Sequence, residues 1–193
     1  QRRSLIQQNP HGFFLQNVVM EYLTDVLIEQ ACQEILEYAA PGRQFRHSAA
    51  AAGASKAQSQ KLKAQSLNRY ALLKATANEA VRASQRRLIV QPLIARLASH
   101  LGKAGLVERL NDLLAALHAE ATPIPGYAAG NLLNLLVYLD VDLRGYDFAQ
   151  LTVRQAYLQG KLLHQVNFAE ADLAQSVFTY VFGDIRALQF SAT

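Results

Sequence analysis

The apolar residues of the chain recur at three different spacings, and each spacing predicts a different kind of element. Near the N-terminus, two short apolar runs flank a turn-forming cluster at residues 9–12, which predicts a hairpin with strands at 4–7 and 13–16. Asn17 is a residue type that often begins helices, and the residues after it are apolar at helical spacing. We therefore expect one helix of about 20 residues here, ended by Pro41.

The middle of the chain combines a polar stretch with several helical patterns. Residues 43–60 are rich in Ala and Ser and poor in large apolar side chains, which is typical of a linker. Pro92 is expected to start or kink a helix, and Gly102 is expected to break one. Helical spacing predicts four further helices, at 61–81, 88–101, 106–120 and 130–139.

Residues 141–178 follow neither the helical nor the strand spacing, because their apolar residues lie five positions apart. Five residues advance a helix by about 500°, so such side chains would point in changing directions. In a strand, an odd step places successive side chains on opposite faces. A chain that turns a corner every five residues buries them together, and four faces close a square coil. The eight expected core centres are Leu143, Phe148, Val153, Leu158, Leu163, Phe168, Leu173 and Phe178.

The residues around these centres resemble the pentapeptide-repeat family. The clearest stretch is VNFAEADLAQSVF, in which Asn167 and Asp172 stand as in the family pattern Ala-(Asp/Asn)-Leu-x-x. The resemblance covers about 40 residues, and Tyr157, Lys161 and Leu162 depart from the pattern. It implies a right-handed quadrilateral β-helix of about two coils, capped by the helix at 130–139. The expected fold class is therefore α+β, with an N-terminal hairpin and helical bundle followed by a short β-helix.

Two other stretches carry a second resemblance. RRSLIQQ…FFLQNVVMEYLTDVLIEQ resembles the end of a winged-helix subdomain, and the tail FGDIRALQFS resembles the opening strand of a WD-repeat propeller. Together with the parts between them, they resemble the connecting region of cyanobacterial-type STAND ATPases, P-loop proteins of the NB-ARC and NACHT type. The nucleotide-sensing Met-His-Asp motif of that family falls on Leu15, Gln16 and Asn17, and Gln16 replaces the sensing histidine. The resemblance implies a fragment without its own cofactor.

These patterns predict five regions along the chain. The predicted regions are a winged-helix-like hairpin and helix at 1–42, a linker at 43–60, a helical region at 61–125, a capping helix with pentapeptide repeats at 126–182 and a propeller-like strand at 183–193.

Charge is distributed unevenly along the chain. The formal net charge is +4, but residues 43–110 hold thirteen Lys and Arg against Glu79 and Glu108 alone, while both flanks are acidic. This basic middle either packs beside the acidic flanks or forms a nucleic-acid-binding patch. Both interpretations stay open at the level of sequence.

The chain lacks the motifs that carry common enzyme chemistry. It contains no phosphate-binding glycine loop, no zinc-protease HExxH and no GxSxG nucleophile motif. Its five histidines are far apart, and Cys32 is the only cysteine, so we expect no metal site and no disulfide. No apolar run is long enough to span a bilayer. The chain is therefore predicted to be a non-enzyme without catalytic residues, cofactor, metal or membrane contact, located in the cytoplasm.

The function expected from these observations is a non-catalytic interaction and coupling module, with protein partners or neighbouring domains of a longer protein. It would link the nucleotide switch of a STAND-type signalling ATPase to a WD-repeat sensor. Two alternatives remain, namely nucleic-acid binding through residues 43–110 and a truncated product without an independent function.

Overall fold

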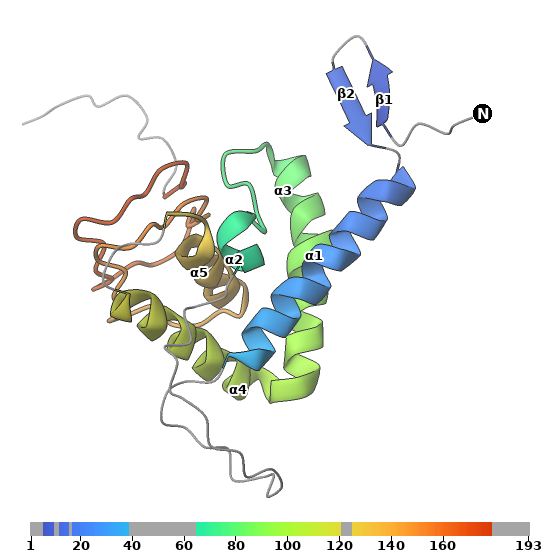
Figure 1. Cartoon of the computed structure of the whole chain (residues 1–193). Helices are drawn as coiled ribbons and strands as arrows, with labels where there is room; N and C mark the ends of the chain where they lie inside the picture. The colour runs from blue at the N-terminus through green and yellow to red at the C-terminus, as the bar shows by residue number, and fades with distance from the viewer. Residues whose placement is uncertain (1–5, 10–11, 16, 39–64, 121–124, 179–193) are drawn as a thin grey trace, which may run out of the picture.

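Helices make up most of the secondary structure in the part of the chain that the structure describes (Figure 1). The computed structural model describes residues 6–9, 12–15, 17–38, 65–120 and 125–178. The elements in chain order are β1 (Ile6–Asn9), β2 (Gly12–Leu15), α1 (Asn17–Glu37), α2 (Gln65–Arg69), α3 (Glu79–Gln85), the π-helix η1 (Arg86–Val90), α4 (Gln91–Ala119) and α5 (Ala128–Tyr138).

The predicted hairpin is confirmed, although its strands are shifted slightly along the chain. β1 pairs antiparallel with β2, with Ile6 opposite Leu15 and Asn9 opposite Gly12. Figure 1 shows this hairpin standing apart from the other elements, beyond the N-terminal end of α1. The predicted linker at 43–60 and the propeller-like strand at 183–193 lie outside the described residues, so the domain boundaries stay predictions.

The long helix α1 forms as predicted, and its C-terminal half supplies the buried face. Ile28, Ala31 and Ile35 are buried where α1 packs against α4 and α2. At the other end of the helix, large apolar side chains such as Val18 and Tyr22 are exposed. Burial of α1 therefore increases toward its C-terminal end.

Gly102 divides α4 into two helical segments that point in different directions. Its backbone adopts φ 68° and ψ 168°, a conformation that other residues rarely adopt, so the predicted break is confirmed. The first segment buries Leu93 and Leu97, and the second buries Leu106, Leu110 and other leucines. Because of the bend, one helix contacts both α1 and α5.

The single helix predicted at 61–81 is wrong. α2 ends at Arg69 and α3 begins at Glu79, so residues 70–78 are not helical. The Glu34 carboxylate of α1 accepts the backbone N–H groups of Ser66 (2.7 Å) and Leu67 (3.1 Å) and thereby caps α2. In the loop that follows, the Leu72 N–H donates to Asn131 and the Ala75 N–H donates to Gln155. These two N–H groups are therefore not available for helical hydrogen bonds.

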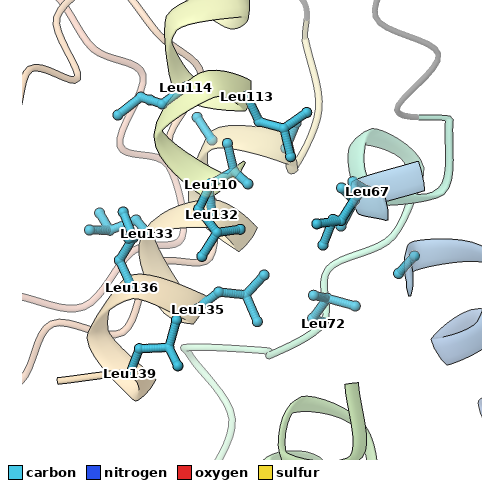
Figure 2. Packing of buried hydrophobic residues seen from close by; sticks show 14 of the residues in the cluster. Leu67, Leu72, Leu110, Leu113, Leu114, Leu132, Leu133, Leu135, Leu136 and Leu139 are labelled. Carbon is cyan, nitrogen blue, oxygen red and sulfur yellow. The ribbon is translucent and has the colours of Figure 1, made fainter. Parts of the chain in front are cut away.

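Helix α5 lies at the centre of the apolar core. Its nine residues from Ala128 to Leu136 are all buried. Figure 2 shows leucines of α4, among them Leu110 and Leu113, gathered with Leu132 and Leu135 of α5 near Leu67 and Leu72. Of the helices that the structure describes, none is long and apolar enough to cross a membrane.

The prediction of an α+β fold with a quadrilateral β-helix is wrong. In the described residues the only β-strands are β1 and β2, and the fold is mostly helical. Residues 141–178, which we call the turn segment, instead form successive turns. Isolated parallel bridges join residues that are twenty apart in sequence. These bridges are Asp147–Asn167, Thr152–Asp172 and Tyr157–Val177.

The backbone of this turn segment explains why no strands form. Every fifth residue from 140 to 175 has a positive φ, so the chain changes direction before an extended ladder can develop. The residues concerned are Asp140, Gly145, Gln150, Gln155, Gly160, Gln165, Glu170 and Gln175.

Candidate functional site: a buried amide junction

The eight predicted core centres all contribute to one apolar core. Leu143, Phe148, Val153 and Leu158 are buried, while the four centres of the following layer are partly buried and pack against them. The Phe148 ring stacks on the Phe168 ring at a centroid distance of 5.5 Å. The Phe168 ring in turn meets the edge of Phe178 at 5.8 Å. These side chains therefore serve packing.

The structure describes one of the two positions singled out at the nucleotide-sensing motif. Asn17 is exposed as the first residue of α1. Gln16 lies outside the described residues.

Asn131 of α5 is buried and makes three side-chain hydrogen bonds. Its Oδ1 accepts the backbone N–H of Leu72 at 2.9 Å. Its Nδ2 donates to the carbonyl oxygens of Leu67 at 2.7 Å and Tyr70 at 2.8 Å. A single amide thus satisfies three backbone groups of the stretch after α2 and fixes this stretch against α5.

One helical turn further, Asn134 binds the turn segment in the same way. Its Nδ2 donates to the Gln155 carbonyl oxygen, and its Oδ1 accepts the Tyr157 N–H, both at 2.8 Å. Gln155 continues the connection, since its Oε1 accepts the Ala75 N–H at 2.7 Å. We call Asn131, Asn134 and Gln155 the amide junction, because these buried side chains connect α5, the stretch after α2 and the turn segment.

A glycine allows α5 to approach the turn segment closely. A Cβ added at Gly130 would overlap the carbonyl oxygen of Arg154. Only a residue without a side chain permits this distance between two backbones. The amide junction and this glycine therefore act at the same contact.

Polar contacts within the turn segment, between its layers and from α4 further hold it together. Asp172 accepts the Ala174 N–H at 3.0 Å and pairs with the Arg154 guanidinium at 2.7 Å, eighteen residues away in sequence. The hydrogen bond from Ala174 N–H, followed by the bond from Arg154, lowers the pKa of the Asp172 carboxyl below its usual value. From α4, the His118 ring lies 3.0 Å from the Asp147 carbonyl oxygen through Nε2.

Two observations bear on the metal and thiol chemistry of the part of the chain that the structure describes. Within these ranges, no group of three or more His, Cys, Asp and Glu side chains is placed to hold a metal ion. Cys32 is buried in α1, and burial raises the pKa of its thiol, which disfavours the reactive thiolate.

Sequence reasoning missed the amide junction, although a signal was present. The stretch GNLLNLLVY is apolar apart from Asn131 and Asn134, which lie three residues apart on one helix face. Asparagines inside an apolar helix need partners, because an unpaired buried amide costs about 1–3 kcal/mol. The pattern indicates that partners exist, but it does not identify them.

Comparison with known proteins connects the chain to WD-repeat proteins. It is similar to an uncharacterized WD repeat-containing protein of Nostoc sp. (strain PCC 7120), with 42% identity over 201 aligned positions that cover 99% of this chain. The chain spans 16% of the length of that relative. No protein-family model matches the chain. No solved structure matches it either.

Proposed function

We propose that the chain is a non-catalytic coupling module of a longer protein, which joins a nucleotide switch of the STAND type to a WD-repeat sensor. In this role the helices and the turn segment move as one body. A displacement of α1 is then transmitted through α4 and α5 to the turn segment. Neighbouring domains of the longer protein are its partners.

The amide junction is the observation that carries this proposal. Asn131 binds the stretch after α2, and Asn134 binds the turn segment, from one helix that is buried over most of its length. Hydrogen bonds of buried amides depend on position and direction, so they fix relative placement more strictly than apolar contacts do. A spacer that transmits a displacement needs this rigidity.

Two further observations support the proposal. The similar Nostoc protein is described as WD repeat-containing, and the matched region is a small share of its length. The N-terminal hairpin followed by α1 agrees with the resemblance to the end of a winged-helix subdomain. The proposed role needs no catalytic group in this chain.

Rigid coupling predicts that the turn segment cannot open independently of the helices. Phe148→Ala removes a buried ring from the turn segment and should cost about 3–5 kcal/mol. Native-state hydrogen exchange should then show the same loss of opening free energy for amides of α4 and for the Phe148 and Asn167 amides, which bond between layers.

The milder Phe148→Leu variant provides the same comparison if the alanine variant does not fold. Tyr22→Ala, at an exposed ring of α1, should change the opening free energy of neither set of amides by more than about 0.5 kcal/mol. Loss of protection in the turn segment with unchanged exchange in α4 would contradict rigid coupling. Measurable ATP turnover by the purified chain would contradict its non-catalytic character.

A further inference from the structure

A cavity of about 280 Å³ opens where η1, the C-terminal end of α5 and the turn segment meet. Leu73, Val90 and Val137 supply its apolar surface, and the rings of Tyr138 and Tyr157 add aromatic surface. Small-molecule sites usually enclose about 300–1,000 Å³, so this cavity is at the lower limit. Its size is suited to one large side chain.

Contacts behind the cavity hold its aromatic wall in place. The Arg82 guanidinium lies over the Tyr157 ring, 4.4 Å from the ring centroid. The Tyr157 hydroxyl donates to Gln159 Oε1 at the cavity. The backbone N–H of Tyr157 is bound by Asn134 of the amide junction. An apolar side chain therefore meets a preformed surface, which reduces the entropy lost on binding.

The charge of the lining is positive. Arg86 and Lys161 line the cavity, and no carboxylate does. Their present partners, Glu79 and Asp140, carry exposed side chains outside the lining. The Lys161–Asp140 pair spans 3.8 Å, and the Asp140 side chain is 91% exposed, so this pair contributes little and a bound anion can replace it.

We propose that this cavity binds an acidic peptide segment of a partner protein. One large apolar side chain of the peptide enters the cavity against Leu73, Val90 and Val137. Carboxylates beside that side chain pair with Lys161 and Arg86. Charge complementarity selects this occupant, because an apolar side chain between carboxylates matches both the apolar surface and the positive lining. The proposal rests on the cavity and is independent of rigid coupling.

The proposal is tested with a fluorescein-labelled seven-residue peptide that carries one phenylalanine between glutamates. A second peptide has lysines in place of the glutamates. Fluorescence anisotropy should show saturable binding of the acidic peptide to the full chain and none of the basic peptide. Lys161→Glu should weaken the acidic peptide about tenfold or more, because it replaces an attractive charge by a repulsive one. Lys161→Gln should weaken it by a smaller factor.

Lys103→Glu is the matched control, since Lys103 is exposed on α4 and does not line the cavity. This variant changes the net charge equally and should leave the affinity within about twofold. Circular dichroism checks that each variant keeps its helices. Equal binding of both peptides, or equal weakening by the Lys103 and Lys161 variants, would overturn the proposal. The proposal would also be overturned, in favour of a small-anion site, if millimolar benzoate displaced the peptide and replacement of the peptide's phenylalanine left the affinity unchanged.

Discussion

Asn131 uses both ends of its amide group to bind backbone atoms of the stretch after α2. Its replacement by leucine keeps the volume but leaves the Leu72 N–H and the Leu67 and Tyr70 carbonyl oxygens without this partner. Each buried group left unpaired costs about 1–3 kcal/mol. We expect Asn131→Leu to lower the free energy of unfolding by at least about 3 kcal/mol, measured by urea denaturation.

Asn111→Leu is the matched control for this prediction. Asn111 is exposed on α4, so the same change should alter stability by no more than about 0.5 kcal/mol. Equal effects of the two substitutions would show that the amide contacts of Asn131 do not stabilise the fold.

Asp172 gives a prediction about pH. Its pKa is lower in the folded chain than in the unfolded chain, first because of the Ala174 N–H and then because of Arg154. Such a group contributes stability above its unfolded pKa of about 3.9, and the contribution is lost as the pH falls through the folded pKa. Asp172→Asn should therefore lower the melting temperature at pH 7 by about 1–3 °C, and the difference should vanish near pH 2.

Asp140→Asn tests whether this difference belongs to Asp172. Asp140 is exposed and its contact with Lys161 is long, so its substitution should change the melting temperature little at either pH. The interpretation would fail if the difference in melting temperature between the Asp172→Asn variant and the unaltered chain became larger as the pH fell.

The residues of the amide junction explain what sequence could and could not predict at this scale. The five-residue spacing identified eight side chains that pack in the core. Asn131 and Asn134 were visible as polar residues in an apolar helix, but their partners were not. The Leu72 N–H lies 59 residues away in sequence from Asn131, and no local pattern relates them.

The same large separation in sequence between contacting residues explains the errors at the level of elements. Helical spacing at 61–81 predicted one helix, but Asn131 and Gln155 bind the N–H groups of Leu72 and Ala75, and tertiary contacts override propensity. Local signals were sufficient elsewhere. Gly102 has a positive φ where a break was predicted, and Asn17 begins α1 as an N-cap residue type suggested.

Gly130 controls how closely α5 approaches the turn segment. Gly130→Ala places a Cβ on the carbonyl oxygen of Arg154, and this backbone atom cannot rotate away. The helix must then move relative to the turn segment and loses part of its packing. We expect a loss of at least about 2 kcal/mol in urea denaturation, even though alanine favours helices over glycine by about 1 kcal/mol.

Gly105→Ala provides the opposite expectation in another helix. An added Cβ at Gly105 would meet Leu101 Cβ at 3.4 Å, an ordinary contact distance, and the Gly105 backbone has no positive φ. Helix propensity should then stabilise the chain by about 0.5–1 kcal/mol. If Gly130→Ala were stabilising as well, the close approach of α5 would not limit the fold.

At the scale of the whole molecule, the apolar core runs without interruption from α1 to the turn segment. The eight centres at five-residue spacing, α1, α5 and the break in α4 were predicted, yet the fold class was not. Regular five-residue turns were interpreted as strands, while the frequent positive φ angles leave only isolated bridges between layers. Periodicity reports which side chains are buried, whereas strand formation depends on how long the backbone stays extended.

The distribution of charge gives the last prediction, which tests nucleic-acid binding through residues 43–110. Among the described residues, Arg82 and Arg86 pair with Glu79, and Arg96 pairs with Glu29 at 2.8 Å. Arg109 is buried and donates to the Leu36 carbonyl oxygen. Four of the eight basic side chains between 65 and 110 are thus engaged within the fold, which reduces the number in this described stretch that can neutralise phosphates together.

We therefore expect the logarithm of the affinity for a labelled 20-base-pair DNA duplex to fall with the logarithm of salt concentration with a slope no steeper than about −2. A protein that neutralises six to ten phosphates gives slopes of about −5 to −9. Fluorescence anisotropy between low and physiological salt measures the slope. A slope of about −5, made shallower by about 1 in both Lys74→Gln and Lys103→Gln, would establish nucleic-acid binding that uses both lysines, because each lysine lost releases one counterion fewer.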